Sequence, residues 1–330
     1  MILGAAARVR RFLSTTGLLP ASTLPRPVVS VGNLVMGGAG KTPHVIHLAR
    51  WLAGQGRRVA VLSRGYGRKS RGVRWVCDGE GPIASAAEGG DEPVLIARSL
   101  PGVPVVVGES RVDAGREVLS RRRVDVFLLD DGFQHISLRR DADLLLVECG
   151  GGLGNRWTVP LGPLREPPSH ARYADALVIT KCPDAESGAR TARAVPFSPG
   201  RPIAFSRLSP GGIVGRDGLP SKEAAAGDAV FAFSGLARNA QFRDTLEAAG
   251  FRVKGFLPFP DHHAYRRGDL ERIAREAGGL PAITTEKDLV RLPDGVPFPV
   301  GALRVEVEYL FGWEEISRMI LERTEGGPRS

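Results

Sequence analysis

The chain has 330 residues, of which 42% are hydrophobic and 25% are charged, a composition typical of a globular protein with one large or two ordinary domains. Its formal net charge of +9 suits an anionic partner, although an Arg-rich genomic composition explains the same excess equally well. Aromatic residues make up only 6% and the basic residues are scattered, which disfavours a base-stacking nucleic-acid platform.

Cysteine usage and the apolar runs exclude further classes. Cys77, Cys149 and Cys182 are odd in number and far apart, so neither a disulfide framework nor a zinc site is expected, and a reducing cytoplasm fits. No apolar run reaches roughly 18 residues, so we expect no transmembrane helix.

The first 27 residues lack a signal-peptide pattern. They predict a short amphipathic helix, on a membrane surface or packed on its own domain, with Ile2, Leu3, Val9, Phe12 and Leu13 opposite Arg8, Arg10 and Arg11.

The segment 28–48 predicts a strand, a glycine-rich turn and a helix in that order. Backbone amides of such a turn and the following helix N-terminus bind phosphate. Lys41 would reach the β- and γ-phosphates, and the Thr42 hydroxyl would ligate Mg²⁺. Val35 replaces the first glycine of the full pattern G-x-x-x-x-G-K-[ST], so a glycine turn without function is the alternative. The expected nucleotide-binding residues are Gly37, Gly38, Ala39, Gly40, Lys41 and Thr42.

Strands and helices alternate along the chain, which predicts a doubly wound, mostly parallel α/β sheet of the phosphate-loop NTPase type with a second, smaller α/β subdomain. The expected strands are 28–31, 58–63, 75–77, 103–108, 124–131, 143–148, 176–180, 202–207, 229–235 and 282–285. The expected helices are 43–54, 94–99, 111–120, 240–250, 269–277 and 313–323. We expect a nucleotide-binding kinase unit over 1–195, a smaller unit over 196–312, and a C-terminal helix and tail over 313–330 that packs on either unit.

Two acidic pairs are candidates for chemistry. Asp130 and Asp131 end an apolar strand, the place of a Mg²⁺-handling acid in phosphate-loop enzymes, although Asp-Asp-Gly is also good turn chemistry. Asp91 and Glu92 lie between a Gly-Gly pair and Pro93, where Asp91 alternatively serves only as a helix cap.

A histidine pair, His262 and His263, follows Asp261 in a loop rich in proline and aromatic residues. Adjacent histidines point apart and no third ligand is evident, which disfavours a metal site. The sequence is compatible with a base-assisting role and equally with exposed loop histidines that have no catalytic role.

These segments, with several others in the same order, resemble the tetraacyldisaccharide 4'-kinase family, the lipid A 4'-kinases. The matching segments are SVGNLVMGGAGKTP (30–43), LSRGYGR (62–68), GGDEPVLIA (89–97), LDDGFQH (129–135), GPLREP (162–167), FSGLARNAQF (233–242), FPDHHAY (259–265) and TTEKDLVRL (284–292). They span about 260 residues, and the family also lacks the first glycine of the phosphate loop.

The resemblance implies transfer of the ATP γ-phosphate to the 4'-hydroxyl of a tetraacylated glucosamine disaccharide 1-phosphate, which gives lipid IVA in lipid A (lipopolysaccharide) biosynthesis. It implies Mg²⁺ as the ion and a peripheral position on the cytoplasmic face of the inner membrane of a Gram-negative bacterium. The implied fold has two α/β/α subdomains, a site in the cleft between them and a β-ribbon that helps to join them. The implied partners are the lipid substrate and an anionic membrane surface, with no nucleic acid and no obligate protein partner.

The resemblance also implies roles for individual residues. Lys41 and the loop amides would hold phosphate, Thr42 would bind Mg²⁺, and Asp130 and Asp131 would take the metal and active-site acid positions. Asp91 would be the general base, assisted by His262 or His263, and Arg64 and Tyr66 match a loop near the substrate. The family's N-terminal region is usually longer and richer in aromatic residues than the roughly 27 residues here, so we expect weaker membrane attachment or attachment through scattered arginines and the substrate.

Two other classes of function compete with the kinase. A phosphate-loop ATPase or GTPase switch explains the loop and Asp130-Asp131 but gives no task to the DHH and GPLREP segments. A basic adaptor without enzymatic activity explains the charge alone.

Overall fold

Apolar β-branched runs form the centre of a twelve-stranded, mostly parallel sheet in the computed structural model, which describes residues 9, 11, 13, 18, 21–81, 83–236 and 239–325. The strands are β1 Val28–Asn33, β2 Val59–Ser63, β3 Arg74–Cys77, β4 Val105–Val107, β5 Val126–Asp130, β6 Ala142–Glu148, β7 Ala176–Thr180, β8 Ile203–Val214, β9 Ala229–Ser234, β10 Arg252–Pro258, β11 Ala282–Thr285 and β12 Val300–Phe311. Their order is β10-β9-β11-β12-β8-β7-β6-β1-β5-β2-β4-β3, and the pairs β3–β4 and β8–β12 are antiparallel. The α/β, mostly parallel fold expected from the sequence is confirmed.

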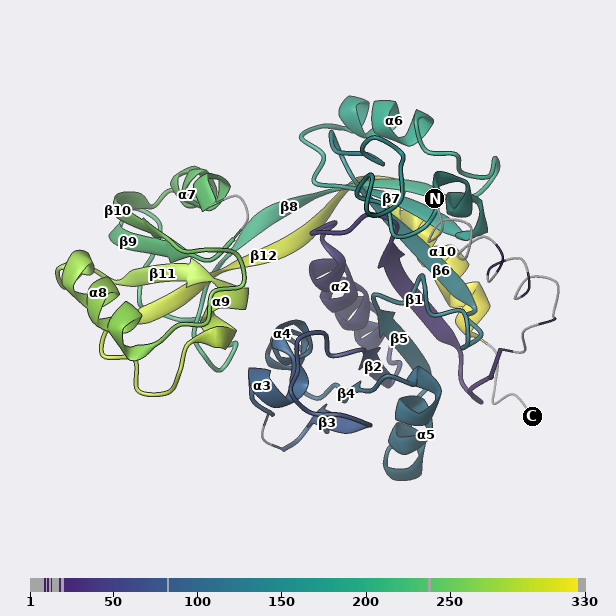
Figure 1. Cartoon of the computed structure of the whole chain (residues 1–330), viewed down its shortest axis with the longest axis horizontal. Coiled ribbons are helices and arrows are strands. Elements are labelled where there is room, and N and C mark those ends of the chain that lie inside the picture. The colour runs from purple at the N-terminus through teal and green to yellow at the C-terminus, as the bar shows by residue number, and fades with distance from the viewer. Residues whose placement is uncertain are drawn as a thin grey trace.

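Helices cover both faces of the sheet (Figure 1). They are α2 Lys41–Gly54, α3 Ala86–Gly89, α4 Asp91–Ser99, α5 Arg111–Arg121, the 3₁₀ helix η1 Pro168–Tyr173, α6 Ala185–Arg193, α7 Asn239–Ala248, α8 Arg267–Ala277, α9 Glu286–Arg291 and α10 Trp313–Thr324. Along the described parts of the chain, no helix is both long enough and apolar enough to cross a membrane.

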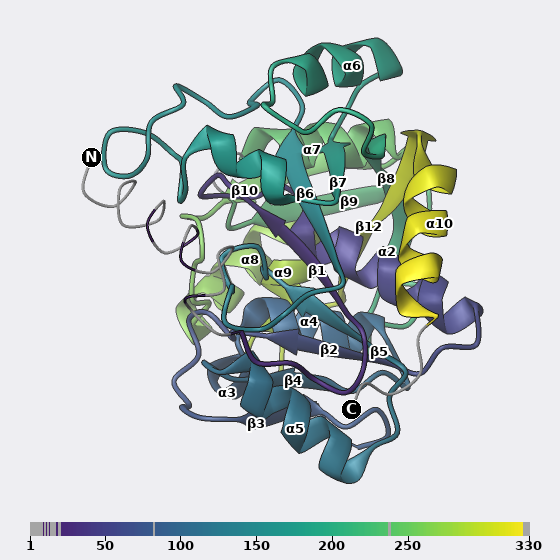
Figure 2. The same ribbon diagram turned by 90° about the vertical axis from the view of Figure 1, so that its right-hand side faces the viewer.

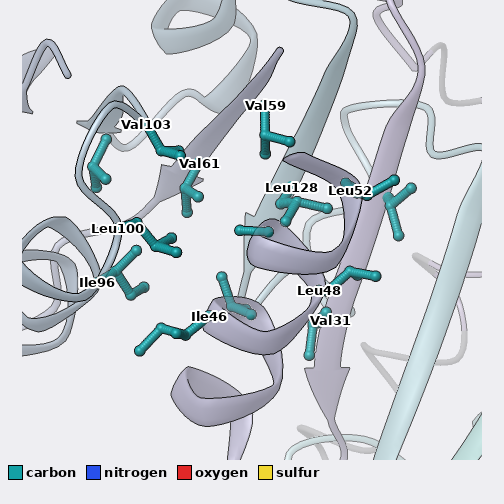
Figure 3. Packing of buried hydrophobic residues seen from close by; sticks show 14 of the residues in the cluster. Val31, Ile46, Leu48, Leu52, Val59, Val61, Ile96, Leu100, Val103 and Leu128 are labelled. Carbon is teal, nitrogen blue, oxygen red and sulfur yellow. The ribbon is translucent and has the colours of Figure 1, made fainter. Parts of the chain in front are cut away.

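The main core lies where α2 packs on the central strands. Ile46, Leu48 and Leu52 of α2 face Val31 of β1 and Leu128 of β5, and all five side chains are buried (Figure 3). The buried residues Val45, Leu48, Ala49 and Leu52 of α2 are spaced at i, i+3, i+4 and i+7 and form one stripe, which fixes how the helix lies on the sheet. The N-terminus of α2 is thereby held at the carboxyl end of β1.

The last helix returns to this core. Ile316 and Ile320 of α10 are fully buried in the cluster that contains Val31, and the Trp313 ring contacts that of Trp51 of α2 at 5.1 Å in an edge-to-face arrangement. Figure 2 shows α10 beside α2. The chain therefore crosses from the first group of strands to β9–β11 and comes back.

Long strands β8 and β12 make that crossing. The start of β8 pairs with β7, while most of its length pairs with β12, and together they form a ribbon between the two groups of elements (Figure 1). The sequence predicted only the first half of β8 and none of β12. Pro210 lies at a register shift opposite Val305. It begins a Pro-Gly-Gly run inside β8, and because proline and glycine are unfavourable in strands, the sequence did not predict a strand there.

The N-terminal segment is described at only a few positions. Ile2, Leu3, Arg8, Arg10 and Phe12 of the expected amphipathic helix lie outside the described residues. Arg11, assigned to its polar face, is buried. Its Nη2 donates to the Phe133 carbonyl and to Glu166 Oε2, each at 3.1 Å, so this position packs on the body of the protein.

Candidate active site

The predicted phosphate loop joins β1 to α2. Gly40 takes the left-handed conformation (φ +77°), and Lys41 is the first residue of α2. Lys41 Nζ donates to Asn33 Oδ1 at 3.2 Å and lies 3.5 Å from Asp131 Oδ1. The first amides of a helix have no partner within it, so this N-terminus offers several N–H donors beside a buried ammonium group.

Three side chains fix the loop from behind. Thr180 Oγ1 of β7 donates to the Ala39 carbonyl at 3.0 Å. His44 Nδ1 lies 2.8 Å from the Gly40 carbonyl and Nε2 lies 3.0 Å from Ser206 Oγ of β8. Burial lowers the pKa of His44 to about 4, so the ring is neutral. Because a carbonyl only accepts, Nδ1 carries the proton and Nε2 accepts from Ser206.

The acids that end β5 lie beside this loop. Asp130 is almost fully buried, and its Oδ2 accepts from Ser63 Oγ at 2.9 Å, whereas its Oδ1 has no hydrogen-bond partner among the described residues. Burial, and then the charges of Glu92 and Asp131, raise the pKa of Asp130 to about 7. A buried carboxyl that ionises with difficulty and has one unsatisfied oxygen is suited to a cation.

Asp131 bridges two cationic side chains. It holds a positive φ of 54°, which turns its carboxylate toward Lys41 on one side and Arg165 on the other. Arg165 Nη1 donates to Asp131 Oδ2 at 2.7 Å. Arg165 belongs to the GPLREP segment, which the sequence analysis singled out without giving this arginine a role. Its backbone N–H donates to the Leu34 carbonyl at 2.7 Å, so the segment lies along the phosphate loop.

Asp91 and Glu92 form the first turn of α4, opposite the phosphate loop. Gly90 precedes them with a φ of +90°, and a Cβ there would come within 3.1 Å of the Tyr66 carbonyl, so only glycine fits. Burial acts to raise the pKa of Glu92, but Lys287 and then Lys41 lower it overall. The charges at Lys41 and at the start of α4 therefore act on one another across the site.

Arg291 of α9 connects Asp91 to the histidine loop. Its Nε donates to Asp91 Oδ2 at 2.6 Å, and its Nη2 donates to His262 Nδ1 at 2.9 Å. His262 Nδ1 also lies 4.0 Å from Asp91 Oδ2. His263 turns away, because its Nε2 bonds Asp269 Oδ2 at 3.0 Å and its ring stacks on Phe259. The structure thus brings His262, and not His263, to Asp91.

The loop after β2 is exposed to solvent at both residues that the resemblance placed near the substrate. Arg64 is exposed, and the Tyr66 side chain is 84% exposed. Burial and the charge of Arg64 lower the pKa of the nearby Arg111, the buried first residue of α5, to about 10. Asp130 and Asp131 act on the same guanidinium, so Arg111 is a further cation of the site. The sequence offered no signal for it beyond its position after β4.

A cavity of about 360 Å³ lies elsewhere, at the end of the sheet where β1, β2 and β5 begin. It is lined by Arg26, Arg58, Leu119, Arg122, Arg123 and Val124, and none of the site residues reaches it.

Known proteins are similar to this chain over most of its length. The model of one family, described as tetraacyldisaccharide-1-P 4'-kinase, matches residues 1–325. A tetraacyldisaccharide 4'-kinase of Anaeromyxobacter dehalogenans (strain 2CP-C) is 43% identical over 321 residues, which cover 93% of this chain and 84% of the relative. That of Geobacter sulfurreducens is 41% identical over 293 residues, covering 88% and 82%. A crystal structure titled as the "apo" form of LpxK from Aquifex aeolicus in complex with ATP is similar with a TM-score of 0.81 and 35% identity, over 98% of this chain and 96% of that one.

Proposed function

Because the chain belongs to the tetraacyldisaccharide-1-P 4'-kinase family, we propose that it transfers the γ-phosphate of ATP to the 4'-hydroxyl of a tetraacylated disaccharide 1-phosphate in lipid A biosynthesis. The chain is a phosphotransferase with a lipid disaccharide phosphate as acceptor and ATP as donor. We further propose that it works at an anionic membrane surface, on the cytoplasmic face of the inner membrane, without an obligate protein partner.

One observation carries the assignment of roles: the acceptor-side acids and the phosphate loop belong to one electrostatic cluster. Lys41 acts on the pKa of Glu92, the residue next to Asp91, and Asp131 acts on both Glu92 and Asp130. Phosphoryl transfer needs a positioned donor, a positioned alcohol and neutralised charge, with little covalent chemistry from the protein. Lys41 and the amides at the start of α2 would hold the donor phosphates.

We assign Asp91 as the general base that accepts the proton of the attacking hydroxyl. Its Oδ2 accepts a hydrogen bond from Arg291 Nε, which orients the carboxylate in the first turn of α4. His262, which also bonds Arg291, would assist by its position beside the Asp91 carboxylate. Arg64 and Tyr66 stand exposed on the neighbouring loop, where a substrate contact would be made.

Mg²⁺ is assigned to Thr42 and Asp130. The unsatisfied Oδ1 of Asp130 and its raised pKa fit a carboxylate that ionises when a cation is present. No group of three His, Cys, Asp or Glu side chains suited to a metal occurs in the described part of the chain. Mg²⁺ does not require one, since it keeps waters and phosphate oxygens as ligands and would neutralise charge on the transferred group.

We retain the division into residues 1–195, 196–312 and 313–330 as a proposal. Its support is that residues 213–303 supply two hydrophobic clusters of their own. Ile316 and Ile320, in contrast, belong to the cluster of the first unit.

The test uses purified protein, ATP labelled in the γ-phosphate and the acceptor in detergent, with products separated by thin-layer chromatography. We expect Lys41→Ala to abolish most transfer and Asp91→Ala to lower kcat by about 10²–10⁴-fold, the usual contribution of a general base. Asp113→Ala is the matched control, because Asp113 is an exposed first-turn acid of α5 whose side chain lies beside Arg116.

Near-normal turnover by Asp91→Ala would remove it from the base role. Nucleotide hydrolysis that ignores the lipid and gives no phosphorylated lipid would instead identify a switch ATPase.

A further inference from the structure

Large apolar side chains are exposed on one loop next to the phosphate loop. Trp157 is 54% exposed and Leu161 is 60% exposed, and Met36 at the tip of the phosphate loop is 58% exposed. Single exposed apolar residues are ordinary, but an exposed tryptophan and leucine on one loop of ten residues are not. We call residues 155–164 the apolar loop.

Hydrogen bonds within the apolar loop hold its backbone in a defined conformation. Asn155 Nδ2 donates to the Leu161 carbonyl at 2.9 Å, and Asn155 Oδ1 accepts from the Trp157 amide at 3.1 Å. The Leu164 amide donates to the Trp157 carbonyl at 3.1 Å. A Cβ at Gly162 would collide with the Asn155 side chain and the Trp157 carbonyl. The backbone therefore holds Trp157 and Leu161 outward by specific contacts.

The loop is also continuous with the phosphate loop. The Met36 amide donates to the Pro163 carbonyl at 2.7 Å, and Val35 forms a bridge with Leu164. Figure 2 shows the teal segment between β6 and α6 reaching the outer edge of the molecule. Anything bound by the apolar loop is thus held beside the nucleotide site.

The exposed charged side chains within residues 150–174 are basic. Residues 150–174 contain Arg156, Arg165 and Arg172 but a single acid, Glu166, which is buried against Arg11. Arg156 is exposed next to Trp157. An apolar tip with an amphipathic aromatic ring and only basic exposed charges is complementary to the headgroup region of an anionic bilayer.

We propose that the apolar loop, together with Met36, inserts into the interface of an anionic bilayer and holds the phosphate loop at the membrane surface. The inference rests on the proposed function for the lipid nature of the acceptor, whose acyl chains keep its sugar at the same depth. A bilayer suits the geometry because Trp157 and Leu161 point outward from the protein. Fluid lipid can surround these side chains, whereas a protein partner would need a groove that matches their shape.

The experiment measures co-sedimentation of the full chain with vesicles of phosphatidylglycerol and phosphatidylcholine, without nucleotide or acceptor. We expect the double variant Trp157→Ser/Leu161→Ser to bind these vesicles about tenfold or more weakly than the unmodified protein, since it removes two large apolar side chains that would enter the bilayer. Arg156→Glu should weaken binding to the anionic vesicles and leave the weak binding to pure phosphatidylcholine unchanged. The matched controls are Leu219→Ser and Phe311→Ser, which are 53% and 56% exposed on other surfaces and should bind normally.

Tryptophan fluorescence gives a direct second readout. The other three tryptophans, Trp51, Trp75 and Trp313, are half-buried, so quenching by brominated phosphatidylcholine should come mainly from Trp157. Trp157→Phe should keep vesicle binding and lose most of that quenching. Unchanged quenching in this variant would overturn the proposal.

The remaining outcomes separate this proposal from its rivals. Unchanged vesicle binding by the double variant, with a raised KM for acceptor in detergent, would mean that the loop contacts acyl chains of the substrate. Unchanged vesicle binding and unchanged KM would leave a protein partner as the occupant. Either result overturns the bilayer assignment. The vesicle assay contains no substrate, so absence of kinase activity would sink the proposed function without affecting this result.

Discussion

Arg291 is the residue on which the acceptor side of the site depends. Its Nε bonds Asp91, its Nη1 bonds the fully buried Asp288 at 3.2 Å, and its Nη2 bonds His262. The planar guanidinium can serve all three because its donors point in fixed, different directions. Since Arg only donates, His262 Nδ1 must accept, which places the ring proton of the neutral imidazole on Nε2.

The two neighbouring histidines are expected to respond differently to removal. His262→Ala should lower kcat by about tenfold or more with little change in Tm, because the side chain is 62% exposed and contacts the Asp91 cluster. His263→Ala should instead cost about 1–3 kcal/mol of stability, since it loses the Phe259 stack and the Asp269 bond. Thermal unfolding and steady-state kinetics on both variants check this. The reverse pattern would assign the catalytic position to His263.

At the scale of single elements, α2 converts a local sequence motif into a rigid site. Its N-terminus presents the loop amides, its apolar stripe packs on β1 and β5, and His44 ties its first turn to both Gly40 and Ser206. Burial lowers the pKa of His47 on the next turn as well. The helix therefore places two neutral imidazoles between the phosphate loop and the ribbon.

Acid should weaken this arrangement. The pKa of His44 is about 4 in the folded protein and 6.5 in the unfolded chain, so between these values the unfolded chain binds more protons. Stability is fully present above pH 6.5 and is lost as the pH falls toward 4, by up to about 3 kcal/mol from this residue. We expect His44→Gln to show a flatter stability curve over that range in denaturant titrations. Parallel curves for the two proteins would exclude the effect.

The terminal helix α10 is a second element with a measurable role. Ile320 is fully buried in the main core, so Ile320→Ala should cost about 2–5 kcal/mol through lost burial and the remaining cavity. Arg318→Ala, on the exposed face of the same helix, should stay within about 0.5 kcal/mol of the unmodified protein. Chemical denaturation measures both. Equal effects would mean that α10 does not stabilise the first unit.

At the scale of the whole molecule, the groups of strands are held relative to one another by contacts between distant parts of the chain. One is the β8–β12 ribbon, and another is the approach of α9 to α4, where Lys287 Nζ bonds Glu92 Oε1 at 2.5 Å and Arg291 bonds Asp91. These ion pairs join residues about two hundred positions apart in the chain. The acceptor-side chemistry therefore exists only when the second group of strands is placed against α4.

A double-mutant cycle measures that second contact. Glu92→Gln, Lys287→Met and their combination should give a coupling energy of about 0.5–1 kcal/mol, the modest value expected when both side chains are about a third exposed. Lys287 lowers the pKa of Glu92, so the coupling should disappear as the pH falls and the carboxylate is protonated. Strictly additive effects at neutral pH would show that this contact does not hold the units together.

Features encoded by neighbouring residues could be inferred before the fold was known. The alternation of apolar strands with amphipathic helices, the glycine turn before Lys41, and the acids that end β5 all depend on periodicity and backbone preference within about ten residues. That is why the α/β class, the phosphate loop and nearly all of the first unit's strands agree between sequence and structure. The polar helix α6, capped by Asp184, was missed because it carries no large apolar side chain and buries only Gly188.

Features that depend on distant residues required the tertiary structure. Nothing near Arg11 predicts its burial against Glu166, and nothing near Arg291 predicts that it orients Asp91. Likewise, adjacent His262 and His263 are equivalent in the sequence, and only the packing of Phe259 and Asp269 turns one of them away. These pairings depend on which surfaces come into contact when the sheet assembles and the ribbon folds back. The free energy of those contacts cannot be inferred from any short stretch of the chain.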